Sequence, residues 1–206
     1  MPGHELSGVV AELGYGTTGL TVGQQVFGVS DWTRNGSLAE YVAVEARNLA
    51  PLPADGVGSI AVQLAREVGA RVMGTGRAAD RETALGLGVD DFVDTQADQL
   101  DDVGEVDLVF DVIGGDIRDR SAGLVRPGGT LVSIVSPVEV RPDDGRAIFF
   151  VVEPDRGRLT DLAQRVRDGR LKPIVGAVRT LPEAPAAFVP DRRTHGKTII
   201  RITDTG

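Results

Sequence analysis

Apolar residues in the middle of the chain follow two different spacings. Short continuous apolar runs, typical of strands buried on both faces, occur at residues 106–113, 130–135 and 148–152. At residues 117–125, and again from Asp155 onward, apolar positions recur at the spacing of a helix. Because strands alternate with helices, the pattern predicts an α/β fold with a doubly wound parallel sheet.

The stretch from Gly56 to Arg77 predicts a turn, an amphipathic helix and a short strand. Gly56 and Gly58 begin a G-x-G-x-x-A pattern, and the free N–H groups and dipole of a helix start favour an anion. In dinucleotide-binding βαβ units, an acid after the second strand binds the ribose of NAD, whereas an Arg suits NADP. Gly76-Arg77 stands at that position with no acid before Asp80, so if a nucleotide binds, the sequence favours NADPH.

The glycine pattern has a second interpretation, a plain turn between a linker and a helix. Residues 48–55, which precede it, contain two prolines, and each removes a hydrogen-bond donor that a central strand needs. This segment is therefore predicted to be a linker. A strand before the glycines is the context that makes the motif specific, and none is predicted here.

The first fifty residues predict a small antiparallel β unit with glycine turns. Its expected strands are Ser7–Leu13, Gln25–Val29 and Leu38–Val44. The end of the chain predicts an extended run at residues 172–181, a short helix near Pro182 and a last strand at 197–202.

Composition removes several classes of function. The 206 residues include 22 basic and 30 acidic side chains, and the net charge of −8 argues against nucleic-acid or anionic-membrane binding. No apolar run approaches the length of a membrane span and no signal segment begins the chain, which predicts a cytoplasmic protein. The absence of Cys excludes disulfides, thiolate nucleophiles and Cys-ligated zinc.

Five segments carry a family resemblance over nearly the whole chain, in the right order. They resemble the medium-chain dehydrogenase/reductase superfamily, and within it the zinc-independent quinone oxidoreductase branch that includes zeta-crystallin. The segments are Gly3-His4-Glu5-Leu6-Ser7-Gly8-Val9-Val10, Leu38-Ala39-Glu40-Tyr41-Val42, Gly56-Val57-Gly58-Ser59, Leu124-Val125-Arg126-Pro127-Gly128-Gly129-Thr130 and His195-Gly196-Lys197-Thr198.

The resemblance implies a Rossmann-like nucleotide-binding domain beside a partial GroES-like β domain. Residues 1–53 are expected to form the β domain, residues 54–153 the Rossmann-like domain, and residues 154–206 a helix and strands that return to the β domain. It further implies that NADPH binds and delivers hydride to a quinone, an enone or another activated carbonyl compound.

Two departures from the family pattern concern length. Relatives begin several dozen residues before Gly3 and carry several dozen more between the equivalents of Asp55 and Gly56. The second gap removes the first Rossmann strand and the front half of the glycine loop. With Gly58 as the last family glycine, Pro53 and Asp55 stand where the other two belong, and a carboxylate there repels a diphosphate.

The candidate cofactor residues lie at the glycine turn, at the end of the following strand and after the later parallel strands. Gly114 follows a buried strand, at the end where ligands of open α/β sheets lie, although a tight turn explains it equally. Residues 134, 135, 150 and 151 are expected to be core residues of strands first, and the resemblance implies that backbone near them lines the nicotinamide pocket. It also implies that the loop at Gly114 faces the nicotinamide ribose and that Lys197 lies near the cofactor. The candidates are Gly56, Val57, Gly58, Gly76, Arg77, Gly114, Ile134, Val135, Phe150, Val151 and Lys197.

The candidate catalytic residues are Asp31 and Tyr41, on or beside a loop that the resemblance places toward the cleft. Tyr41 has a phenol that can donate a proton, although a buried Tyr at a strand end is the simpler interpretation. In zinc-dependent relatives the His equivalent to His4 is a metal ligand. With two His and no Cys in the chain, His4 and Glu5 are expected to be structural and no metal is predicted.

Three functions remain open from the sequence. The first is an NADPH-dependent reductase, since hydride transfer asks little of side chains. The second is a cofactor-independent isomerase, dehydratase or cyclase, motivated by Pro53 and Asp55 at glycine positions. The third is a non-catalytic oligomerising module. Because a missing central strand leaves exposed ladder groups, the chain is also predicted to form a homodimer or larger assembly, with a small molecule as its other partner.

Overall fold

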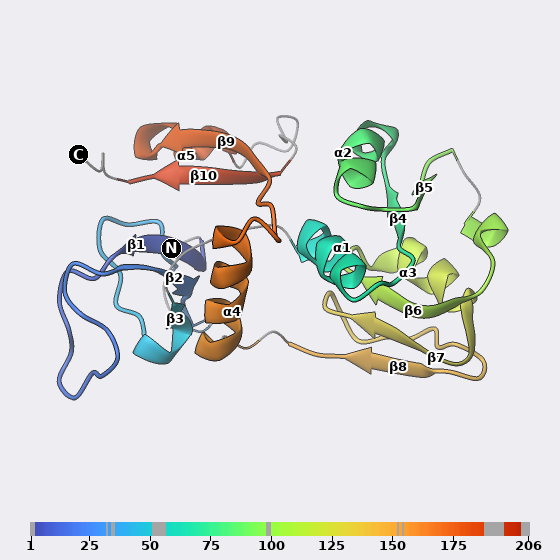
Figure 1. Ribbon diagram of the computed structural model, residues 1–206, viewed down its shortest axis with the longest axis horizontal. Coiled ribbons are helices and arrows are strands. Elements are labelled where there is room, and N and C mark those ends of the chain that lie inside the picture. Colours follow the sequence, from blue (N-terminus) through green and yellow to red (C-terminus); the bar gives the residue numbers. More distant parts are fainter. Residues whose placement is uncertain are drawn as a thin grey trace. The chain divides into compact units, whose positions relative to one another are not determined.

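The structure, a computed structural model, describes residues 3–31, 33, 36–50, 57–97, 100–151, 153, 155–187 and 196–202. Contacts within the chain divide it into two compact units. The first unit is formed by Met1–Gly56 with Pro154–Gly206, and the second by Val57–Glu153. Each unit has its own sheets and helices (Figure 1).

The first unit contains a three-stranded antiparallel sheet, and two of its strands overlap strands that the sequence predicted. Its order is β1 (Glu5–Val9), β2 (Gln25–Val29) and β3 (Leu49–Ala50). Gly28 is required in the middle strand, because a Cβ there would lie 1.8 Å from the carbonyl oxygen of Asn48. A small core formed by Val10, Leu20, Val26 and Leu49 stabilises this unit.

Helix α4 (Arg156–Arg167) packs on this antiparallel sheet, where the buried Ala163 meets Phe27 of β2. The Asp155 carboxylate caps the helix by accepting a hydrogen bond of 2.8 Å from the Arg158 N–H. The unit is completed by a parallel pair and a short helix, β9 (Val175–Thr180), α5 (Ala184–Ala187) and β10 (Lys197–Arg201).

The second unit is α/β with parallel strands throughout, which confirms the predicted fold class. Its strands form two sheets, one with two members and one with three. The smaller consists of β4 (Met73–Gly76) and β5 (Asp91–Asp94), and the larger of β6 (Val106–Asp111), β7 (Val125–Ser133) and β8 (Arg146–Phe149). The helices are α1 (Val57–Glu67), α2 (Arg81–Gly86) and α3 (Gly115–Ala122).

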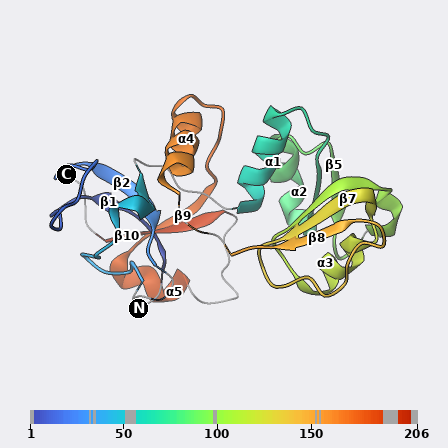
Figure 2. The same ribbon diagram turned by 90° about the horizontal axis from the view of Figure 1, so that it is seen from below.

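Helix α3 packs on one face of the larger sheet, where Ala122 and the fully buried Leu131 form a core. Helix α1 lies on the opposite side (Figure 2). At its C-terminal end, Arg66 donates to both carboxylate oxygens of Asp90 at 3.1 Å, while Asp90 accepts from the Val72 N–H. These contacts connect α1 to the start of β5.

The two parallel sheets are not joined through any strand that the structure describes. Strands β4 and β6 therefore each end a sheet, and the predicted first Rossmann strand has no counterpart among the described residues. On β6, Leu108 and Phe110 are exposed. Helix α1 has no fully buried residue, although its apolar residues share one face.

The strand expected at residues 38–44 is absent from the structure, because β3 takes the edge of β2 through the pairs Phe27–Ala50 and Gly28–Leu49. The linker expected at residues 48–55 is wrong at its start, because Leu49–Ala50 form β3. Residues 126–129 lie inside β7, where its pairing with β6 contains a bulge. The register moves from Val106–Val125 to Leu108–Thr130, and Gly128 takes a positive φ of 76°.

Candidate functional site

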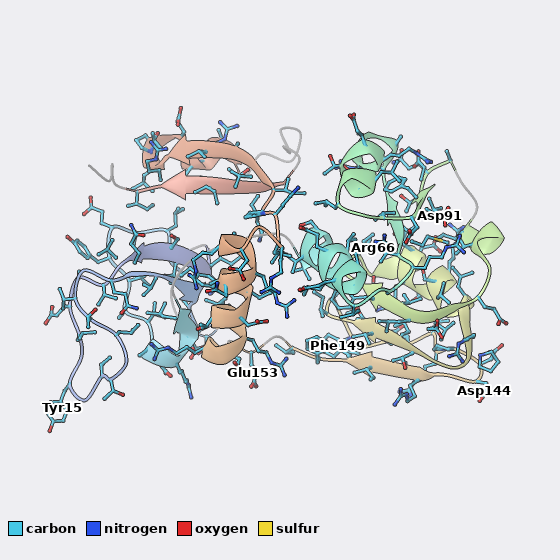
Figure 3. All side chains as sticks on the ribbon, viewed as in Figure 1. Tyr15, Arg66, Asp91, Asp144, Phe149 and Glu153 are labelled. Atoms are coloured by element: carbon cyan, nitrogen blue, oxygen red, sulfur yellow. The ribbon has the colours of Figure 1, made fainter. Side chains whose placement is uncertain are left out.

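The candidate site begins at the edge where β6, β7 and β8 end. Because the three strands are parallel, their carboxyl ends lie side by side, and each continues into a connecting segment at that edge. Phe149, labelled in Figure 3, is the last residue of β8. The predicted site residues Gly114, Ile134, Val135 and Phe150 follow within three residues of the strand ends.

A buried carboxylate organises the segment after β6. Asp111 ends that strand and is 6% exposed. Its Oδ1 atom accepts hydrogen bonds from the backbone N–H of Ile113, at 3.0 Å, and of Gly114, at 2.8 Å. Its Oδ2 atom accepts a bond of 2.6 Å from the hydroxyl of Ser133, the last residue of β7. One side chain therefore holds the ends of two strands.

Gly114 occupies a conformation that other residues avoid. Its φ of 77° and ψ of −170° belong to a region that is essentially restricted to glycine. A Cβ at this position would also lie 2.9 Å from Cγ1 of Val135. The two segments predicted to contact a cofactor thus touch each other at Gly114.

Apolar side chains line this edge and face solvent. The exposed residues beside the strand ends are Val112, Ile113, Val135, Phe149, Phe150 and Val151, with Val151 68% exposed. The prediction that Val135, Phe150 and Val151 are strand core is wrong, because β7 and β8 end before them; Ile134 is half-buried. An exposed apolar group at this edge is typical of a ligand surface.

Helix α3 is tied to the segment after β7 by Arg118, which is 5% exposed. Its Nη1 donates to the Ser136 hydroxyl at 2.8 Å and to the Pro137 carbonyl at 3.1 Å, while Nε donates to Asp119. Asp111, Ser133 and Arg118 are not among the site residues predicted from the sequence. Asp111 and Ser133 could have been found there, because each is a polar residue that ends an apolar strand.

At the end of β4, Gly76 and Arg77 lie beside Asp80. The Asp80 carboxylate accepts from the Arg77 backbone N–H at 3.1 Å and from Arg77 Nε at 3.3 Å. The Arg77 side chain is 61% exposed. A Cβ on Gly76 would lie 3.2 Å from Phe92 and 3.3 Å from the Asp80 carboxylate, so this position has room for little besides glycine.

The start of α1 is the third part of the candidate site. Val57 is exposed, and the described first turn contains no acid, so no carboxylate within that turn neutralises the helix dipole. Gly58 lies near the end of β6, since a Cβ on it would be 3.8 Å from Cγ2 of Val112. Gly56, Pro53 and Asp55 lie outside the described residues.

The remaining candidates belong to the first unit. Asp31 accepts bonds from the N–H and hydroxyl of Thr33 at 2.8 and 2.7 Å. Tyr41 is 79% exposed, so its interpretation as a buried Tyr is wrong. Lys197 donates to both oxygens of Glu5 at 2.8 and 2.7 Å.

His4 lies within hydrogen-bond distance of the Ser30 hydroxyl, with 3.1 Å between Nδ1 and Oγ. In the part of the chain that the structure describes, no three His, Cys, Asp or Glu side chains gather as they would around a metal ion. The same residues include no helix long and apolar enough to cross a bilayer.

Comparisons with known proteins identify the family. The alcohol dehydrogenase GroES-like domain matches residues 1–54, and the family described as zinc-binding dehydrogenase matches residues 56–143. Together these matches cover more than half of the chain. The chain belongs to the medium-chain dehydrogenase/reductase superfamily, which confirms the superfamily that the motifs in the sequence resemble.

Individual relatives are distant. The chain is 27% identical over 261 residues to the spectinabilin polyketide synthase system protein NorB of Streptomyces orinoci, covering 97% of this chain and 12% of the relative. It is 26% identical over 251 residues to the chloroplastic NADPH-dependent alkenal/one oxidoreductase of Arabidopsis thaliana, covering 97% and 63%. The chain thus spans less than two thirds of either relative.

Among solved structures, the quinone oxidoreductase from Coxiella burnetii has a TM-score of 0.85 at 19% identity, covering 98% of this chain and 80% of that one. This similarity shows the shared fold. Both sequence alignments run over more than the 206 residues of this chain, so the relatives carry residues inside the aligned region that this chain lacks.

Proposed function

We propose that this chain is an NADPH-dependent oxidoreductase that transfers hydride to a small molecule, namely a quinone, an enone or another activated carbonyl compound. One observation carries the proposal. The exposed apolar residues beside the ends of β6, β7 and β8, which form an apolar rim, lie together with Gly114 at the carboxyl edge of a parallel sheet. Ligands of open α/β sheets bind at that edge.

The described residues fit such a cofactor at three places. Arg77 offers a cation to the phosphate that distinguishes NADPH from NADH, although Asp80 now pairs with that cation. The start of α1 at Val57 and Gly58 suits the diphosphate. The absence of a side chain at Gly114 leaves backbone accessible. The further proposed contacts are Gly56, Gly76, Ile134, Val135, Phe150, Val151 and Lys197.

Bound NADPH would supply the hydride. The chain would orient the nicotinamide and the acceptor, and its apolar rim would exclude water. Tyr41, with an exposed phenol, is proposed to donate a proton to the reduced acceptor, and Asp31 is proposed to help bind the acceptor beside it. No metal takes part in the proposed reaction.

The relatives support this function over its alternatives. The Arabidopsis relative is named as an NADPH-dependent oxidoreductase of alkenals and alkenones. None of the relatives described above is named as an isomerase, a dehydratase or a cyclase. The division into domains at residues 1–53, 54–153 and 154–206, the homodimer and the cytoplasmic location remain proposals.

The experiment is a titration of the pure protein with NADPH, followed by the fluorescence of the nicotinamide, and then an assay of NADPH oxidation with a quinone and with an enone. Saturable binding and acceptor-dependent oxidation are expected. An absence of binding at millimolar NADPH would contradict the proposal. NADH serves as the matched ligand, because it lacks only the phosphate assigned to Arg77.

A further inference from the structure

Asp111 and Ser133 form a buried polar pair between the two segments of the proposed nicotinamide site. Asp111 is 6% exposed and Ser133 is fully buried. The carboxylate accepts three hydrogen bonds, two from the segment after β6 and one from Ser133. A buried carboxylate is stable only when such donors replace water, so the pair holds both strand ends in place.

The Ser133 hydroxyl extends this connection to the second segment. While it donates to Asp111, its oxygen accepts from the Val135 N–H at 3.2 Å. The backbone adds a parallel connection, because the Ile134 N–H donates to the Asp111 carbonyl at 3.2 Å. A chain of hydrogen bonds thus runs from Gly114 through Asp111 and Ser133 to Val135.

We propose that Asp111 and Ser133 are positioning residues that set the spacing between residues 112–115 and residues 134–135, and thereby the placement of the nicotinamide ring for hydride transfer. This inference rests on the proposed function. Neither side chain needs to touch the cofactor. The pair acts through the backbone N–H groups of Gly114 and Val135. These two residues lie so close together that a Cβ on Gly114 would be 2.9 Å from Cγ1 of Val135.

This role predicts unequal effects on rate and on affinity. Hydride transfer depends steeply on the placement of the reacting atoms, and a misplacement of about 1 Å costs on the order of a hundredfold in rate. Arg77 and the start of α1, which are proposed to bind the rest of the cofactor, do not contact the pair in any hydrogen bond described above. The pair should therefore matter more for kcat than for the Kd of NADPH.

Ser133→Ala is the direct test, and Ser121→Ala is its matched control. Ser121 is also buried in the second unit, but its hydroxyl donates to the Ile117 carbonyl within α3. Ser133→Ala is expected to lower kcat by at least about tenfold and to raise the Kd of NADPH by less than about threefold. Ser121→Ala should change both by less than about twofold. Equal effects of the two substitutions on kcat would overturn the proposal.

Asp111→Asn provides the conservative variant, with Asp111→Ala as its partner. The Asn oxygen can still accept from the Ile113 and Gly114 N–H groups. Asp111→Asn should retain a kcat at least about fivefold above that of Asp111→Ala at equal folded fraction. If Asp111→Ala does not fold, the comparison of Asp111→Asn with the wild type and Ser133→Ala stands in its place. A kcat of Asp111→Asn equal to the wild type, together with an unaffected Ser133→Ala, contradicts a positioning role.

Amide hydrogen exchange separates this inference from the proposed function, because it needs no cofactor. In Ser133→Ala the Val135 amide loses its acceptor, so its exchange should accelerate at least about tenfold relative to Ser121→Ala. Unchanged exchange would overturn the inference even in an active enzyme. Conversely, wild-type protein that binds no NADPH overturns the cofactor role, while accelerated exchange would still establish the coupling of the two segments.

Discussion

Arg77 is the residue proposed to distinguish NADPH from NADH. Its side chain is 61% exposed, and its guanidinium pairs with the Asp80 carboxylate. A cofactor phosphate would take the place of that carboxylate. Arg77→Ala should therefore weaken NADPH binding by about tenfold, corresponding to about 1.4 kcal/mol, and leave NADH binding nearly unchanged. Fluorescence titration with both nucleotides measures this difference.

The control for that prediction is Arg71→Ala. Arg71 is also exposed and pairs with Asp91 in the same unit, and this partner raises the pKa of its guanidinium. Arg71 lies outside the proposed site, so its loss should affect the two nucleotides equally. Equal loss of NADPH affinity in both variants would show that Arg77 acts only through the net charge.

Substitutions at Gly114 can separate the stability cost of its positive φ from the cost of a steric contact with Val135. Gly114→Ala should lower the free energy of unfolding by about 1–3 kcal/mol, because φ is positive and the new Cβ meets Val135. The double variant Gly114→Ala with Val135→Ala removes the contact but keeps the strain. Denaturant unfolding of both single variants and the double variant gives the two contributions. Full recovery in the double variant would mean that strain contributes nothing.

At the scale of elements, the N-terminal cap of α4 should contribute measurably to the free energy of unfolding. Asp155→Ala removes the acceptor for the Arg158 N–H and should lower the free energy of unfolding by about 1 kcal/mol. Asp155→Ser, which keeps a capping oxygen, should cost much less. Thermal unfolding followed by circular dichroism compares the two, and equal losses would show that the cap is not the source of the effect.

The hydrogen bonds from Thr180 to Glu183, just before α5, should make the stability of the fold depend on pH. The backbone and hydroxyl hydrogen bonds from Thr180 lower the pKa of Glu183 below its usual 4.5. Since the folded pKa lies below the unfolded one, the carboxylate stabilises the fold above about pH 4.5, and this contribution is lost as the pH falls through the folded pKa. Glu183→Gln should therefore lose less stability than the wild type on acidification. Glu12→Gln, an exposed Glu of the same unit, is the control for thermal melts at several pH values.

At the scale of the whole molecule, the open edge of β6 argues for association. Among the strands that the structure describes, only β7 pairs with β6. The ladder groups on the other side of β6, beside the exposed Leu108 and Phe110, can therefore pair with another chain, and a homodimer or larger assembly is expected in solution. Light scattering measures the molar mass. A monomer of 21.7 kDa at high concentration would contradict the prediction.

Leu108→Lys places a charge on that edge and should shift the assembly toward the monomer. Val22→Lys adds the same charge at an exposed position outside the strands of the first unit and should leave the molar mass unchanged. If both variants dissociate to the same degree, the charge rather than the β6 edge governs association.

The sequence by itself determined the features that depend on short-range periodicity. The parallel α/β unit, the antiparallel first unit and the helix that follows Asp155 were predicted from the spacing of apolar residues. Such signals are local, because the spacing of apolar residues within a segment distinguishes a helix from a strand without reference to its neighbours. The family also followed from the sequence, since its motifs appear in order.

Only the tertiary structure decided which residues meet at the site. Asp111 and Ser133 are 22 positions apart and come together because β6 and β7 pair in parallel. The strand expected at residues 38–44 failed for a related reason: β3 occupies the available edge of β2. Strand pairing depends on residues far apart in the sequence, and the spacing of apolar residues within one strand does not determine which strand it pairs with.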